Sequence, residues 1–174
     1  NSLAYHLDGA RLFNAMVAKG ESPKQYGKIF DSISICLSKG LGCPVGSLIL
    51  GTKDFIKQAK RVRKKFGGGW RQAGFLAAAG IYALDNHVDR LAEDHAKAKR
   101  LADALKNAAF VTEVVEPETN IVIFKVEDGN AVIQKFEENN ISIIAMANNM
   151  LRMVTHLDVS DEQIDHTIQI IESI

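Results

Sequence analysis

The segment 30–51 constrains the fold most, because a strand pattern there ends in a lysine and a glycine-rich loop. Apolar residues alternate with small ones from Ile33 to Leu37, and Lys39 follows two residues later. Three glycines stand among residues 40–46, and a second strand pattern begins at Val45. Glycine lets the backbone bend tightly and lets a bulky group approach. The segment therefore predicts two neighbouring strands, with one lysine at the bend between them.

The position of Lys39 also has a chemical consequence. A lysine at the end of a buried strand is expensive to keep charged, because desolvation disfavours the ammonium form. A lowered pKa makes the amine a nucleophile, and such amines form Schiff bases with carbonyl compounds and with pyridoxal phosphate (PLP). The alternative is a solvated lysine in a turn, and this segment alone leaves both interpretations open.

A second strand pattern, residues 3–8, ends in Asp8, and a helical pattern over 9–19 follows Gly9 directly. A carboxylate at the carboxyl end of a strand in an α/β sheet points into the crevice where ligands bind. PLP enzymes need such an acid, since it pairs with the pyridinium nitrogen and keeps the ring protonated. Asp8 precedes Lys39 by one strand–helix–strand unit. The alternative role for Asp8 is a helix cap.

Charge and composition exclude several classes of function. The 174 residues include 21 basic and 21 acidic ones and are 47% apolar. This balance gives no reason to expect nucleic acid or a membrane surface as partner, and the apolar content suits a globular core. No apolar run reaches transmembrane length, and no set of histidines and acids has metal-ligand spacing, so we expect no metal.

The two cysteines, Cys36 and Cys43, flank the lysine and do not form a disulfide framework. We read them as small core residues in a reducing compartment, which favours a cytoplasmic protein.

The order of the patterns predicts an α/β fold in two domains, 1–90 and 91–174. Gly20 to Gly27 reads as a connection. The Gly67–Gly69 run ends a helix that Thr52 or Asp54 begins, with Phe55, Ile56, Ala59 and Val62 facing inward. Strands are expected at 3–8, 30–37, 45–51, 110–115, 120–126, 141–145 and 151–155. Helices are expected at 9–19, 52–65, from about 71, 85–106, 131–139 and 160–174, the last beginning with a capping box at Ser160.

Five motifs in this order resemble the low-specificity L-threonine aldolases, which are fold-type I PLP enzymes of the β-eliminating lyase group. The motifs are His6–Arg11, Ser38–Gly42, Gly67–Gly74, Leu91–His95 and Leu151–Asp158. The resemblance implies that residues 1–90 form the C-terminal part of a PLP-dependent transferase-like large domain. Residues 91–174 would then form a small α+β C-terminal domain.

The resemblance also implies roles for five residues of the first domain. Lys39 would form the Schiff base, and Asp8 would pair with the pyridinium nitrogen. Arg11 would reach the substrate carboxylate or the edge of the cofactor, Arg71 would contact the cofactor phosphate, and Lys64 would lie near the substrate. Without the resemblance, Arg11 and Lys64 read as surface residues, and the loop before Arg71 reads as an exposed helix N-terminus.

Arg152 stands in an alternating apolar strand pattern, where an unpaired charge is expensive. A guanidinium binds a carboxylate through two parallel hydrogen bonds, which suits an amino-acid substrate. The resemblance places the carboxylate-binding arginine at this motif. The alternative is an arginine held by a salt bridge.

The implied activity is PLP-dependent cleavage of L-threonine or L-allo-threonine to glycine and acetaldehyde, by a cytoplasmic homodimer or homotetramer of threonine catabolism and glycine biosynthesis. The resembled enzymes are about twice this long, so we expect the chain to be the C-terminal half. Its partner would be the N-terminal half that carries the phosphate-binding loop, and the isolated chain would be inactive. Two alternatives stay open: another PLP β-eliminating lyase, or a non-catalytic fragment that only folds or associates.

Overall fold

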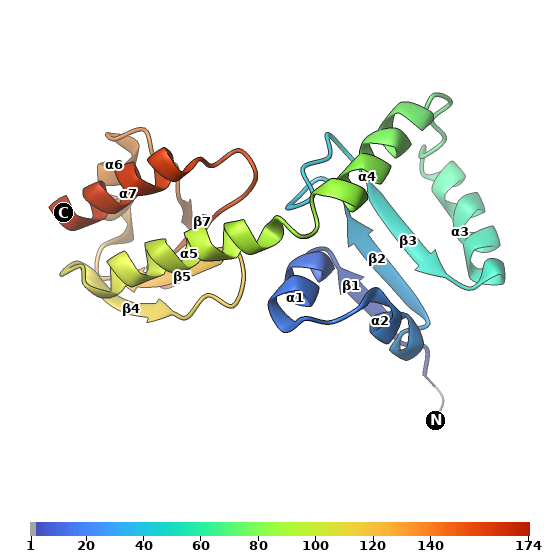
Figure 1. Ribbon diagram of the computed structural model, residues 1–174, viewed down its shortest axis with the longest axis horizontal. Helices are drawn as coiled ribbons and strands as arrows, with labels where there is room; N and C mark the ends of the chain where they lie inside the picture. The colour runs from blue at the N-terminus through green and yellow to red at the C-terminus, as the bar shows by residue number, and fades with distance from the viewer. Residues whose placement is uncertain (1–2) are drawn as a thin grey trace. The chain divides into compact units, whose positions relative to one another are not determined.

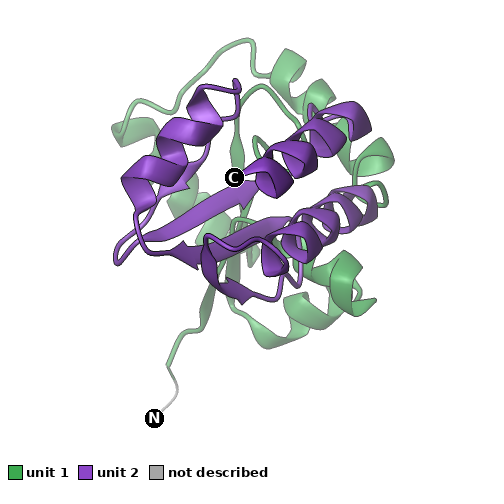
Figure 2. Cartoon of the chain, turned by 90° about the vertical axis from the view of Figure 1, so that its left-hand side faces the viewer, with its two compact units in different colours: residues 1–90 green, residues 91–174 purple. Residues whose placement is uncertain are grey.

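The computed structural model describes residues 3–174 and shows two compact units, residues 1–90 and 91–174 (Figure 1; Figure 2). Both units mix helices with a β-sheet, as the alternating sequence patterns predict. The elements of the first unit are β1 (His6–Gly9), α1 (Leu12–Lys19), α2 (Pro23–Ile29), β2 (Ser32–Cys36), β3 (Ser47–Gly51), α3 (Lys53–Lys65) and α4 (Gly74–Asn86).

The first unit contains a three-stranded sheet of order β1-β2-β3. Strand β2 runs parallel to β1 and antiparallel to β3. The connection through α1 and α2 is the crossover that a parallel pair requires. Alternate residues of β2, Ile33 and Ile35, pack against Leu12 and Met16 of α1. The side chains between them face the other side of the sheet, where the candidate site lies.

Two expectations for this unit were wrong. Residues 20–27 were expected to form a connection, but α2 occupies most of that stretch. Ser22 and Gln25 form a capping box around Pro23 there, which is a strong local helix signal. The inward packing expected along α3 is also incomplete, because Val62 is 52% exposed. The predicted cap is confirmed, since Thr52 Oγ1 accepts a hydrogen bond from the Phe55 amide at 3.3 Å.

The second unit contains a four-stranded antiparallel sheet of order β4-β5-β7-β6. One core joins the three helices to a single face of this sheet, with Leu105, Phe136 and Ile164 packed on Phe124 and Leu151. Its elements are α5 (Leu91–Lys106), β4 (Val111–Val115), β5 (Ile121–Val126), α6 (Gly129–Glu137), β6 (Ile144–Ala145), β7 (Met150–Val154) and α7 (Asp161–Ser173).

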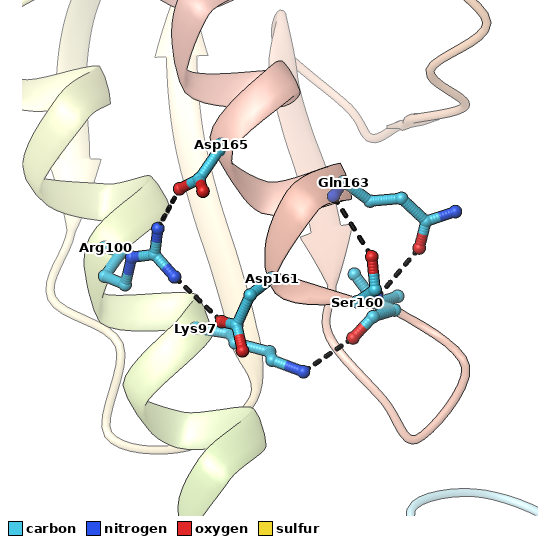
Figure 3. A network of polar contacts seen from close by, with 7 residues as sticks. Lys97, Arg100, Ser160, Asp161, Gln163 and Asp165 are labelled. Atoms are coloured by element: carbon cyan, nitrogen blue, oxygen red, sulfur yellow. Dashed lines mark hydrogen bonds and ion pairs between the residues drawn. The ribbon is translucent and has the colours of Figure 1, made fainter.

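Polar contacts fix the start of α7 against α5 (Figure 3). Arg100 donates to Asp161 at 2.9 Å and also to Asp165, so one guanidinium spans the first turns of α7. Lys97 Nζ donates to the Val159 carbonyl at 2.6 Å. These contacts hold the segment after β7, which contains part of the motif around Arg152, against the helical layer.

Candidate active site

Asp8 and Lys39 are placed by two adjacent parallel strands. Asp8 lies one residue before the end of β1 and pairs with Ser34 of β2. Lys39 follows the last residue of β2, Cys36, by three residues. Because parallel strands end at the same edge of a sheet, both chemical groups belong to the carboxyl edge of this sheet. This is the arrangement predicted from the strand pattern.

The carboxylate of Asp8 is exposed and is oriented by two donors on the same oxygen. Oδ1 accepts from the Ala10 amide at 3.2 Å and from the Ser34 hydroxyl at 3.5 Å. The N-cap of α1 is Arg11, and the helix begins at Leu12. Asp8 is therefore not the cap of α1, and its local hydrogen bonds fix the direction of a carboxylate that faces away from the core.

Ser34 is a contact that the motif analysis missed. The signal was present in the sequence, because Ser32 and Ser34 alternate with Ile33 and Ile35 in β2. This places both serines on the face that carries Asp8. Ser32 Oγ lies 2.8 Å from His6 Nδ1, which makes a second polar pair along the same two strands.

Gly9 allows the close approach of β1 to β2 beside Asp8. A Cβ atom at this position would lie 2.7 Å from the Ser34 carbonyl oxygen, closer than real side chains come. A side chain there would push apart the two strands that carry the site. The glycine after Asp8 is thus required by strand packing.

The loop after β2 is fixed by three backbone hydrogen bonds. The Leu37 amide donates to Gly46 at 2.9 Å, and the Cys43 amide donates to Leu37 at 3.1 Å. The Gly42 amide donates to the Lys39 carbonyl at 2.8 Å, and Gly42 has a φ of 70°, which favours glycine. The loop backbone of Lys39 is therefore well defined.

The side chain of Lys39 is exposed, so the desolvation expected from its place after a buried strand is not supplied by the described residues. The buried strand pattern ends at Leu37, and Lys39 lies beyond it. The amine is held at the sheet edge and is accessible to a ligand.

Cys36 lies beside this loop and responds to the charge of the lysine. Burial raises the pKa of the Cys36 thiol, but hydrogen bonds from Ser38 and Ser47 and the positive charge of Lys39 outweigh burial, so the pKa lies below its ordinary value. Cys43 differs, since burial raises its pKa. The positive charge of Lys39 thus acts on the same sheet face as Asp8.

The remaining candidate residues of the first unit come from different segments. Arg11 is half-buried and lies three residues after Asp8, before the start of α1. Lys64 lies in the last turn of α3, and Arg71 is exposed between α3 and α4. The glycine turn folds back on α3, because a Cβ atom at Gly69 would lie 3.2 Å from Lys64 Cδ. Of these three residues, only Arg11 lies close to Asp8 in the sequence.

Arg152 lies in β7 of the second unit and is considered there by itself. It pairs with Ile123 of β5 and Ile144 of β6, while its neighbours Leu151 and Met153 belong to the core face. Its Nε atom is buried and has no hydrogen-bond partner among the described residues. A buried donor without a partner is costly, so the Nε–H group of Arg152 lowers the stability of this sheet.

A family comparison gives this geometry its context. The family model described as "Beta-eliminating lyase" matches residues 1–129, which include Asp8, Lys39 and Arg71. The chain belongs to the beta-eliminating lyase family. Beta-eliminating lyases of this fold are PLP-dependent enzymes, so the cofactor implied by the motifs is confirmed for the family.

The curated proteins most similar in sequence to this beta-eliminating lyase chain are described more specifically than the family. It is 49% identical over 163 residues to the low specificity L-threonine aldolase of Escherichia coli strain K12, covering 94% of the chain and 48% of that protein. The chain thus spans about half the length of the curated relatives it matches. The resemblance found in the motifs is confirmed.

Solved structures confirm the fold class of this family member. A protein from Exiguobacterium sp. 255-15, described as an aromatic amino acid beta-eliminating lyase/threonine aldolase, matches 97% of the chain with a TM-score of 0.78 and 22% identity, covering 51% of that protein. The Leishmania major threonine aldolase matches 97% of the chain with a TM-score of 0.74 and 16% identity, covering 51% of that protein. The chain therefore has the α/β architecture of fold-type I enzymes.

Two structural properties of residues 3–174 bear on other functions. None of the helices there is long and apolar enough to cross a membrane. Within the same residues, no three histidines, cysteines or acids come together as a metal site.

Proposed function

We propose that this chain forms the lysine-bearing part of a PLP-dependent low-specificity L-threonine aldolase. The reaction is the cleavage of L-threonine or L-allo-threonine to glycine and acetaldehyde. The observation that carries this proposal is the placement of Asp8 and Lys39 at the carboxyl ends of two adjacent parallel strands. Identity of 49% to the Escherichia coli aldolase supports the choice of reaction.

The residues present fit the cofactor at two points. The exposed Asp8 carboxylate, oriented through Oδ1, would pair with the pyridinium nitrogen, and the exposed Lys39 amine would hold the cofactor's aldehyde carbon. PLP, when bound, supplies an electron sink for the pair left on Cα as the Cα–Cβ bond breaks. Asp8 contributes by holding a positive charge on the ring nitrogen.

Arg152 is the proposed carboxylate receptor. Arg152 is only half-buried as a whole, and the fork of a guanidinium can bind the two oxygens of a substrate carboxylate through parallel hydrogen bonds. Fixing the carboxylate sets the direction of the Cα–Cβ bond. Arg11 would add charge near the carboxylate or the cofactor edge, Arg71 would contact the phosphate, and Lys64 would lie near the substrate.

The proposed setting is a cytoplasmic homodimer or homotetramer that acts in threonine catabolism and glycine biosynthesis. Two free cysteines and the balanced charge support this setting. The division into residues 1–90 and 91–174 is proposed to separate the C-terminal part of the cofactor-binding domain from a small domain that carries Arg152.

A chimera tests the function directly. This chain would replace the matching half of the Escherichia coli aldolase, and acetaldehyde release from L-threonine and L-allo-threonine would be measured with added PLP. We expect activity in the chimera and none in its Lys39→Ala variant. Borohydride reduction should place pyridoxyl mass on the peptide that contains Lys39. Label on Lys53 or Lys64 instead would contradict the assignment.

A second candidate is β-elimination on another amino acid. It is favoured by the family description and by the joint description of the Exiguobacterium protein. The two reactions give different products, since elimination releases an α-keto acid and ammonia, whereas the aldol cleavage releases glycine and an aldehyde. Assaying both product pairs with the same chimera decides between them.

A further inference from the structure

Strand β7 is paired on both edges only as far as Arg152. On one edge, the two-residue strand β6 pairs with Leu151 and Arg152. On the other edge, β5 continues to pair through Met153 and Val154. Within residues 3–174, no strand pairs with Met153 or Val154 on the β6 side. Arg152 therefore lies where the two-sided pairing stops, and the end of β7 needs another support.

Two buried polar residues, Asn120 and Thr155, continue the ladder just beyond β5 and β7. We call these two residues the β7 anchor. The Thr155 amide donates to the Asn120 carbonyl at 3.0 Å, and Asn120 Nδ2 donates back to the Thr155 carbonyl at 2.8 Å. The side-chain amide of Asn120 thus supplies one of the two hydrogen bonds that a regular antiparallel pair makes with backbone groups alone. Asn120 is 2% exposed and Thr155 is 1% exposed, so water does not compete for these bonds.

The hydroxyl of Thr155 ties the same point to the helical layer. Its Oγ1 atom donates to the Asp94 carbonyl, in the first turn of α5, at 2.6 Å. The Asn120 carbonyl lies 3.4 Å from Oγ1, which is longer than an ordinary hydroxyl hydrogen bond. Because side chains alternate along a strand, Thr155 points toward the helices and Arg152 points to the opposite face of the sheet. The anchor therefore holds the backbone of β7 from the side that the guanidinium does not use.

Polar side chains at this place are unfavourable for stability alone. Asn120 Oδ1 is buried and accepts no hydrogen bond from the described residues, which is destabilising. The next two residues on the same face of β5, Val122 and Phe124, are apolar and fully buried. An apolar pair in place of the anchor would pack but could not make hydrogen bonds that fit one register only. Because a slip of one residue moves every side chain to the other face of a sheet, a fixed register keeps Arg152 on its face.

We propose that Asn120 and Thr155 are positioning residues for Arg152. Their hydrogen bonds fix the end of β7 that β6 does not reach, and so they hold the backbone from which the guanidinium reaches the substrate carboxylate. Thr155 follows Arg152 by three residues, about 10 Å along a strand, so movement of this end is transmitted directly to Arg152. The inference rests on the proposed function of Arg152, and it adds two residues that touch no substrate but set its affinity.

Steady-state kinetics of the chimera test the anchor. Thr155→Val keeps the branched shape and removes the hydroxyl, so the KM for L-threonine should rise about three- to tenfold, the factor that one net hydrogen bond gives. The kcat should stay within about twofold, and Thr155→Ser should restore the wild-type KM. Thr167→Val is the matched control, because it removes a hydroxyl that donates to the Gln163 carbonyl at 2.8 Å within α7. An unchanged KM in Thr155→Val, or an equal change in Thr167→Val, would overturn the proposal.

A double-mutant cycle tests whether the anchor acts through Arg152. With Arg152→Lys already present, Thr155→Val should raise the KM no further, because the contact that it positions is lost. Effects that add on a logarithmic scale would overturn the proposal. If Arg152→Lys alone left the KM unchanged, the proposed role of Arg152 would fail first, and this inference would fall with it. The two failures are therefore distinguishable.

Amide hydrogen exchange tests the same anchor without activity. Asn120→Ala removes the donor to the Thr155 carbonyl together with the unpartnered Oδ1, so it decides the matter even where Thr155→Val does not fold. In the chain itself, either variant should exchange about tenfold faster in peptides that cover the end of β7, with α6 unchanged. Thr167→Val should leave β7 at the wild-type rate. Wild-type exchange at the end of β7 in a folded Asn120→Ala chain would overturn the proposal.

Discussion

Replacing Arg152 by methionine should stabilise the fold while removing the proposed substrate contact. The buried Nε has no hydrogen-bond partner among the described residues. Leaving such a donor unpaired costs about 1–3 kcal/mol. Methionine has a similar reach, fills irregular apolar space and has no donor, and the strand neighbours Ile123 and Ile144 are apolar. We therefore expect the free energy of unfolding to rise by about 1–2 kcal/mol.

Urea denaturation of the chain, followed by circular dichroism, measures this change. The midpoint should increase while the slope with urea stays constant, because the surface exposed on unfolding changes little. Lys125→Met is the matched control, since Lys125 is exposed and lies on the same sheet face as Ile123. Its effect should stay within about 0.5 kcal/mol. If Arg152→Met destabilised the chain, the guanidinium would have a structural partner, and the argument that its Nε–H group is unpaired would fail.

The same residue has a separate kinetic consequence. In the chimera, Arg152→Lys should raise the KM for L-threonine by about tenfold or more, because a lost charged hydrogen bond is worth roughly 1.5–3 kcal/mol. The cofactor absorbance should stay normal. An unchanged KM would refute the carboxylate-binding role, whatever the stability result.

Three other changes give distinct expectations. Asp8→Asn in the chimera should leave PLP bound but lower turnover by about 10²–10³-fold, because an amide cannot hold the pyridinium charge; near-normal turnover would remove Asp8 from the reaction. Burial lowers the pKa of His95 despite the opposing charge of Asp94, so the unfolded state binds more protons. Stability should then fall as pH drops through the ordinary histidine value of about 6.5, and His95→Gln should weaken this dependence in urea titrations between pH 7 and about pH 5. Ser160→Ala removes the hydroxyl that accepts from the Gln163 amide at 3.3 Å (Figure 3) and should cost about 1 kcal/mol in the same urea assay; no change would show that the remaining contacts, from Arg100, Lys97 and the Gln163 side chain, are enough to hold the start of α7.

Much of the fold follows from local patterns in the sequence. The alternation of Ile33 and Ile35 with serines gives β2 and its two faces, and Ser160 with Gln163 gives the start of α7. Residues 20–27 were misread because glycine and proline were weighted above the capping box at Ser22. The side chains that cover a helix were harder to predict. The periodicity of α3 shows an apolar side, but whether Val62 is covered depends on distant parts of the protein.

Some features of the candidate site likewise follow from local sequence patterns, whereas others depend on segments that are far apart in the chain. Asp8 and Lys39 could be paired from sequence, because each ends a strand pattern and parallel strands end at one edge. The contact between Asp8 and Ser34 needs the register of β1 on β2, which no local pattern contains. Burial of the Arg152 Nε is harder still to predict from the sequence, because it depends on β5 and β6 pairing on either side of β7. The apolar strand pattern around Arg152 was enough to predict that burying this arginine would be costly. Only the assembled sheet shows that Nε is the atom that is buried without a hydrogen bond. The predicted increase in the free energy of unfolding of Arg152→Met therefore comes from this single unpaired N–H group.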